Sequence, residues 1–157
     1  EVKSAVCSAL GRKFLGYALW VAKGREVKCA VAEKALCNFK ARIRQLTRRS
    51  GGRSIAQVVD RLSPYLLGWR TYFGMAQTPG VWRTLDEWLR HRLRAIQLKH
   101  WKRPGAIYRE LKVLGAAESV ARQVAVNSRR WWRNSNRLLK TVLTIAYFDR
   151  LGLPRFS

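Results

Sequence analysis

A pair of amphipathic helical patterns within residues 62–94 constrains the fold more than any other part of the sequence. The first pattern spaces its large apolar residues four, three and four positions apart, which places them on one helical face: Leu62, Leu66, Trp69 and Phe73. The pattern stops at residues 75–77, and Thr78 followed by Pro79 is typical of the start of a new helix. The sequence therefore predicts a helical hairpin.

The second helix of this hairpin is expected to bury one face and to expose arginines on another. Its apolar stripe comprises Val81, Leu85, Trp88 or Leu89, Leu93 and Ile96. Arg83, Arg90 and Arg94 fall on a different face, and we expect that face to lie on the outside of the hairpin. We interpret the tryptophans first as core residues, with direct ligand contact as the alternative.

The net charge limits the partners that this chain can have. It is +23 over 157 residues, and self-repulsion on this scale destabilises a compact state unless a polyanion relieves it. Apolar residues make up 48% of the chain, which is enough for a core, so the charge does not indicate disorder. Nucleic acid is the favoured partner, and a membrane surface or an acidic protein is the alternative.

The sequence shows no sign of a membrane span or of a secretion signal. No apolar run approaches the length of a span, and charges interrupt any apolar core in residues 1–14. The three cysteines form no CxxC pair, and their odd number favours reduced thiols over disulfides or zinc. We expect a cytoplasmic protein of bacterial type, with an organelle as the alternative. Because the chain does not begin with Met, we also expect it to be a fragment.

A β-hairpin is expected near the N-terminus, followed by a helix with a strongly basic side. Residues 14–21 and 26–31 are rich in aromatic and β-branched residues. The helix is expected over residues 33–49, where Lys40, Arg44 and Arg48 follow one another at a spacing of four. Like charges at this spacing repel, so such a column is typical of a face that follows phosphates, with an ordinary solvated face as the alternative.

Further helices are expected along the rest of the chain. Ser54 and Gln57 have the spacing of a capping box, and Pro64 is expected either to kink the helix that they begin or to restart it. Residues 127–136 are predicted to form the longest polar loop. A last helix is expected to begin after Asn136, to carry Ile145 on its apolar side, and to stop at Gly152 and Pro154.

No catalytic residue, metal ligand or cofactor site is expected in this chain. Asp86 and Glu87 are adjacent and point to different faces of a helix, which does not suit a shared metal. His91 and His100 lie too far apart along one helix to act together. Paired aspartates that could hold two divalent ions for phosphoryl transfer do not occur. We therefore expect that this chain is not an enzyme on its own.

Binding of structured RNA is the function that the sequence predicts. Basic residues interleaved with aromatic ones can neutralise phosphates and stack on bases. The residues expected to contact RNA are Lys40, Arg42, Arg44, Arg48, Arg49, Arg53, Arg70, Arg83, Arg90, Arg94, Lys99, Lys102, Arg103, Arg129, Arg130, Trp132 and Arg133. Of the neighbours Trp131 and Trp132, we expect one to pack inward and the other to stack on a base; the sequence does not distinguish them.

Five segments, taken in order, resemble the C-terminal part of group II intron-encoded reverse transcriptases. LSPYLLGWRTYF at residues 62–73, with VWRTLDEWLRHRLR and KHWKRP after it, resembles their maturase-specific domain. FLGY at 14–17 resembles the last strand segment of the polymerase palm, and FKARIRQLTRRSGG at 39–52 resembles the thumb. The tail, from WWRNSN at 131–136 through AYFDRLGLPRF at 146–156, resembles the end of the maturase region.

The resemblance implies a mainly α protein, a helical bundle with one N-terminal β-hairpin. Residues 1–31 would be the end of the palm, 32–62 thumb-like helices, and 63–157 the maturase-specific X domain. It implies that the chain grips intron RNA to assist splicing and that its thumb helps to hold the RNA/DNA primer–template. The missing fingers and palm would be a further partner, Mg²⁺ would bind only there, and the parent would be an RNA-directed DNA polymerase.

Two other hypotheses stay open at this stage. The chain could be the thumb of a reverse transcriptase that works only in DNA synthesis, such as a defence-associated relative. It could also be an unrelated basic helical protein that binds DNA or a ribosomal site. The hypothesis of an unrelated basic protein differs from the maturase and thumb hypotheses because it requires comparable affinity for duplex DNA and structured RNA.

Overall fold

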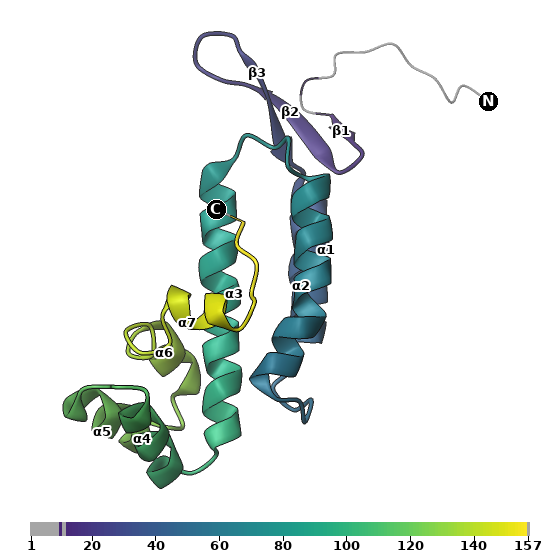
Figure 1. The fold of residues 1–157 in the computed structure, drawn as a ribbon. Helices are drawn as coiled ribbons and strands as arrows, with labels where there is room; N and C mark the ends of the chain where they lie inside the picture. Colours follow the sequence, from purple (N-terminus) through teal and green to yellow (C-terminus); the bar gives the residue numbers. More distant parts are fainter. Residues whose placement is uncertain (1–9, 11, 157) are drawn as a thin grey trace.

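The computed structural model describes residue 10 and residues 12–156, and within them a small sheet precedes a set of helices (Figure 1). The prediction of a mainly α fold is confirmed. In chain order the elements are β1 (Lys13–Phe14), β2 (Tyr17–Val21), β3 (Val27–Val31), α1 (Glu33–Leu46), α2 (Ile55–Tyr72), α3 (Pro79–Trp101), α4 (Pro104–Val113), α5 (Glu118–Val126), α6 (Trp131–Asn136) and α7 (Ile145–Arg150).

The predicted β-hairpin is present as β2 and β3, which pair antiparallel with Tyr17 opposite Val31. The short strand β1 adds a third, antiparallel strand that sequence periodicity could not reveal, because two residues form no pattern. The sheet packs on the C-terminal end of α2. There Tyr17 donates a hydrogen bond to the carbonyl of Tyr72, and its ring centroid lies 5.1 Å from that of Phe73. The hairpin thus finds its packing partner within this chain.

The helical hairpin expected around residues 62–94 is formed by α2 and α3. Ser54 and Gln57 make both bonds of the predicted capping box: Ser54 N–H donates to Gln57 Oε1 at 2.9 Å, and Gln57 N–H donates to Ser54 Oγ at 3.2 Å. Helix α2 continues through Pro64 and does not restart there. Pro79 occupies the first turn of α3 as expected, but the Thr78 side chain makes no capping bond. The prediction of a Thr78 cap is therefore wrong.

One apolar core joins the helices of both halves of the chain. Its fully buried members come from α1 through α5 and the C-terminal segments, and the large ones include Phe39, Ile43, Leu62, Leu66, Leu89, Leu93, Leu111, Leu139 and Phe148. After α7 the chain runs back along α3 toward the sheet (Figure 1). The predicted boundary between residues 62 and 63 falls inside the continuous helix α2. The division into regions 1–31, 32–62 and 63–157 stays a prediction.

The C-terminal third departs from the sequence prediction in two places. Within the predicted loop 127–136, residues Trp131–Asn136 form the short helix α6. The last helix begins at Ile145, where the Thr144 hydroxyl accepts a hydrogen bond from Tyr147 N–H, whereas we expected a helix from Asn136. None of the helices in the described part of the chain combines the length and apolar character that a bilayer span requires.

Candidate nucleic-acid interface

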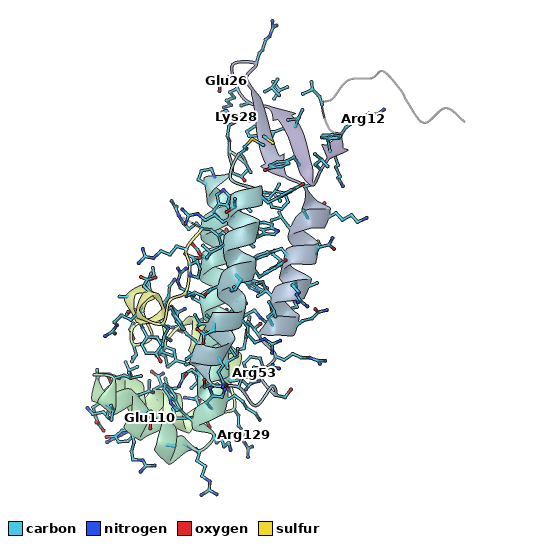
Figure 2. All side chains as sticks on the ribbon, turned by 45° about the vertical axis from the view of Figure 1, so that its right-hand side comes forward. Arg12, Glu26, Lys28, Arg53, Glu110 and Arg129 are labelled. Atoms are coloured by element: carbon cyan, nitrogen blue, oxygen red, sulfur yellow. The ribbon has the colours of Figure 1, made fainter. Side chains whose placement is uncertain are left out.

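Four segments that are distant in sequence meet at the end of the molecule remote from the sheet. They are the residues that follow α1, the loop that begins α2, the C-terminal end of α3, and the segment that leads into α6. Figure 2 shows Arg53 and Arg129 at this end and Glu26 at the opposite end, on the sheet. Tertiary packing therefore gathers residues that the sequence places in separate groups.

Two adjacent hollows open at this end of the molecule. One, of about 400 Å³, lies between the α1–α2 loop and the end of α3. The other, of about 260 Å³, extends from the end of α3 to the segment before α6. Arg49, Lys99 and Lys102 line both of them, so the two form one continuous surface. We call this surface the basic groove; the cations that line it are Arg49, Arg53, Lys99, Lys102 and Arg129.

The described residues that line the basic groove include no Asp or Glu. Ser50, Ser54 and Ser128 supply hydroxyl groups, and Gly52 leaves the backbone open on one side. Guanidinium, ammonium and hydroxyl groups are the donors that proteins use on phosphate oxygens. The groove is therefore built to accept an anion with several oxygens.

Arg49 and Trp131 both line the groove and contact each other. The guanidinium carbon of Arg49 lies 3.6 Å from the centroid of the Trp131 ring, a cation–π stack between the end of α1 and α6. Burial lowers the pKa of Arg49, which nonetheless remains a cation at neutral pH. Trp131 is partly buried and packs against the apolar core. Of the two neighbouring tryptophans, Trp131 is thus the one that packs inward.

Residues 36–114 match the family model of the group II intron maturase-specific domain, and this segment is half of the 157-residue chain. The chain belongs to this family. The resemblance found in the sequence is confirmed. A comparison with curated proteins gives no match. The matched segment runs from within α1 through α4 and contains four cations of the basic groove: Arg49, Arg53, Lys99 and Lys102. The groove residues Arg129 and Trp131 lie beyond the matched segment.

Two of the arginines expected on the outside of the maturase-specific domain are buried. Arg90 is 4% exposed, and its Nη1 lies 3.4 Å from Oδ1 of the equally buried Asp86. Arg94 is 3% exposed, and its Nε donates to the carbonyl of Leu143 at 2.8 Å. Burial, followed by the nearby charge of Arg90, lowers the pKa of Arg94 to about 10. The predicted exposed face at Arg90 and Arg94 is therefore wrong: the C-terminal segments cover it.

The predicted basic column of α1 faces the seam between α1 and α3. Arg44 is exposed, and its guanidinium carbon lies 5.6 Å from the centroid of the Trp88 ring. Arg92, which we did not predict, approaches the same ring at 5.4 Å and donates from Nε to the Thr47 hydroxyl at 2.8 Å. Lys40 is half-buried and Arg48 is exposed. The prediction of a helix over residues 33–49 is wrong at its end: α1 stops at Leu46, so Arg48 lies beyond it and only Lys40 and Arg44 keep the predicted helical spacing. The seam between α1 and α3 already occupies Arg44.

The remaining predicted residues are exposed and do not line the groove. These are Arg42, Arg70, Arg83, Arg103, Arg130, Trp132 and Arg133. Trp132 is 41% exposed, and its ring centroid lies 3.6 Å from that of His91, whose Nε2 donates to the Trp132 carbonyl. Arg130 and Arg133 line a third hollow together with Arg137, which was missed although its spacing of four from Arg133 is visible in the sequence.

His100 is a groove residue that sequence reasoning did not assign to RNA binding. It lines the hollow between the α1–α2 loop and α3, beside Lys99 and Lys102. Burial lowers the pKa of His100, and a hydrogen bond to the backbone of Arg53 partly opposes that effect. The net effect lowers the pKa of His100 and favours its neutral form. Across the described residues, no cluster of three or more His, Cys, Asp or Glu side chains is arranged to hold a metal ion.

Proposed function

We propose that this maturase-specific domain binds structured group II intron RNA in the basic groove and thereby assists splicing. The observation that carries the proposal is the convergence of Arg49, Arg53, Lys99, Lys102 and Arg129 on one groove whose lining contains no carboxylate. Uncompensated like charges at one site repel each other, and a polyanion that enters the groove removes this repulsion. Each phosphate neutralised there releases condensed counterions, which is the main source of nucleic-acid affinity.

The shape of the groove favours RNA with an irregular backbone over a uniform duplex. Sequence-specific recognition of RNA targets loops, bulges and ends, where phosphates turn inward and bases separate. We infer that the two hollows of about 400 and 260 Å³, joined at Arg49, Lys99 and Lys102, receive neighbouring phosphates of such a backbone. Family membership supports intron RNA as the source of that backbone.

We further propose that the parent protein is an RNA-directed DNA polymerase and that α1 and α2 contribute to holding its RNA/DNA primer–template. The segments at 14–17 and 39–52 support this proposal by their resemblance to palm and thumb. The polymerase aspartates and their Mg²⁺ would then belong to fingers and palm that pack against this chain. The alternative of a thumb that serves DNA synthesis alone shares these features, but it does not require an affinity for intron RNA.

A triple variant of the groove tests the proposed function. Arg53→Gln, Lys99→Gln and Arg129→Gln together remove three exposed cations without touching the core. At about 0.7 units per phosphate, the slope of log Kobs against log salt should flatten by about 2 units. At about 1 kcal/mol per contact, affinity for intron RNA at low salt should fall roughly 100-fold. Binding isotherms across a salt series provide both quantities.

The matched control removes the same charge elsewhere. Arg61→Gln, Arg109→Gln and Arg150→Gln alter exposed arginines on α2, α4 and α7 that do not line the groove. This control should lose much less affinity and retain the slope of the parent chain to within about 1 unit. Equal losses in the two triple variants would show that only total charge matters, and the groove would not be the binding site.

The pH dependence of RNA binding provides a separate prediction at His100. A phosphate in the groove favours the protonated ring, so RNA should raise the pKa of His100 above its lowered value in the free chain. Protons are then taken up on binding, and affinity should increase as the pH falls from 8 to about 6. Isotherms at several pH values should show this increase for the parent chain and a smaller one for His100→Gln. Identical pH profiles would contradict a phosphate beside His100.

A further inference from the structure

The segment from Asn127 to Asn134 is a wall between the basic groove and another basic hollow. Ser128, Arg129 and Trp131 line the groove side of this wall. Asn127, Arg130, Arg133 and Asn134 line the hollow on its other side. The side chains of one short segment therefore serve two hollows.

The second hollow has a volume of about 230 Å³ and lies between α5 and α6. We call it the arginine pocket; its polar lining consists of three guanidinium groups and three carboxamides, from Arg130, Arg133, Arg137, Gln123, Asn127 and Asn134. The described residues that line it include no carboxylate. The three arginines follow at spacings of three and four over about two helical turns, and all three line the pocket.

The carboxamide groups of the pocket are held in place by the backbone. Asn134 is 5% exposed, and its Nδ2 donates to the carbonyl of Asn127 at 2.8 Å. Nδ2 of Asn127 in turn donates to the carbonyl of Gln123 at 3.0 Å. The first bond ties α6 to the end of α5, the second lies within the end of α5, and together they fix two of the three carboxamide side chains before any ligand arrives. A polar site that is ordered in advance loses less entropy on binding.

We propose that the arginine pocket binds a phosphate of an unpaired RNA nucleotide, and that one RNA strand crosses the wall from the basic groove to the pocket. The proposal rests on the proposed function. Guanidinium groups match phosphate oxygens in a forked geometry, and carboxamides hydrogen-bond the edges of bases. A free strand can follow the sharp turn over the wall, whereas a stiff duplex cannot bend over so short a segment. The pocket thus selects single-stranded RNA.

The test uses the full chain with Arg133→Gln and Arg137→Gln, both at exposed positions. The probe is a short uridine oligonucleotide, with inorganic phosphate and uridine monophosphate as second probes. The double variant should bind the oligonucleotide roughly tenfold more weakly. The slope of log Kobs against log salt should become shallower by about 0.7–1.4 units. Uridine monophosphate should shift the Nε–Hε NMR signals of the pocket arginines more than inorganic phosphate does. Equal shifts from the two second probes would overturn the nucleotide assignment.

Two further comparisons separate this inference from a structural role and from the proposed function. Arg133→Lys with Arg137→Lys keeps the charge but not the forked geometry, so it should retain the slope and lose part of the affinity, less than the Gln variant does. A loss as large as in the Gln variant, with a lowered melting temperature, would assign the arginines to folding. If the groove triple variant loses binding and the pocket variant does not, the pocket inference fails alone. If only the pocket variant loses binding, the groove proposal fails, and with it the strand that crosses from the groove; only the binding of a phosphate in the pocket is then retained.

Discussion

Replacing Asp86 by Ala is expected to lower the free energy of unfolding by about 3–5 kcal/mol, because it leaves a buried charge without its partner. Asp86 is 3% exposed, and the backbone N–H of Phe156 donates to its two oxygens, each at 3.2 Å. The guanidinium of Arg90, which is 4% exposed, lies against the same carboxylate. Loss of the carboxylate removes the ion-pair partner of Arg90 and the hydrogen-bond acceptor of the Phe156 N–H, and both groups are buried.

Denaturant titration of two comparison variants tests this explanation. Asp86→Leu combined with Arg90→Met replaces the pair by apolar side chains of similar size and should recover most of the lost stability. A remaining loss of about 1–3 kcal/mol is expected, because the Phe156 N–H is still without an acceptor. Glu87→Ala, at the exposed neighbouring position, should cost less than about 0.5 kcal/mol. An Asp86→Ala variant as stable as Glu87→Ala would exclude the buried pair as the cause.

Replacing Phe156 by Ala is expected to cost about 3–5 kcal/mol, although this residue lies far beyond the matched family segment. Phe156 is 8% exposed, and its ring centroid lies 5.7 Å from that of Phe39, 5.8 Å from that of Trp69 and 5.7 Å from that of Trp82. The ring thus joins α1, α2 and α3 at one point. Its removal leaves a cavity among aromatic side chains that cannot collapse together.

Thermal and denaturant unfolding of Phe156→Ala can be compared with Ile145→Ala, which is 48% exposed and should have a much smaller effect. A double-mutant cycle with Asp86→Ala is expected to show a coupling of at least about 0.5 kcal/mol, because Asp86 holds the backbone of Phe156. Additive losses would show that the ring and the backbone bond act independently. A stability equal to that of the parent chain would contradict the packing of Phe156 in the core.

Local patterns in the sequence determined the elements of this protein and its family. The spacing of Leu62, Leu66 and Trp69 predicted α2, and the Ser54–Gln57 pair predicted its first turn. The aromatic and β-branched residues at 14–21 and 26–31 predicted the β2–β3 hairpin. These features depend on residues within a few positions of one another, so an inspection of the chain can find them. The family segment was recognisable for the same reason, since its residues are contiguous.

Only the tertiary structure decided which arginines face solvent and which of the exposed ones meet. Periodicity shows that Arg90 and Arg94 lie outside the apolar stripe of α3. It does not show that the distant segments around Leu143 and Phe156 cover the face on which these arginines lie. The basic groove likewise joins residues near 50, 100 and 130, which come together because α1, α3 and α6 pack on one core. A local pattern places a side chain on its own helix; contacts distant in sequence determine its neighbours and its burial.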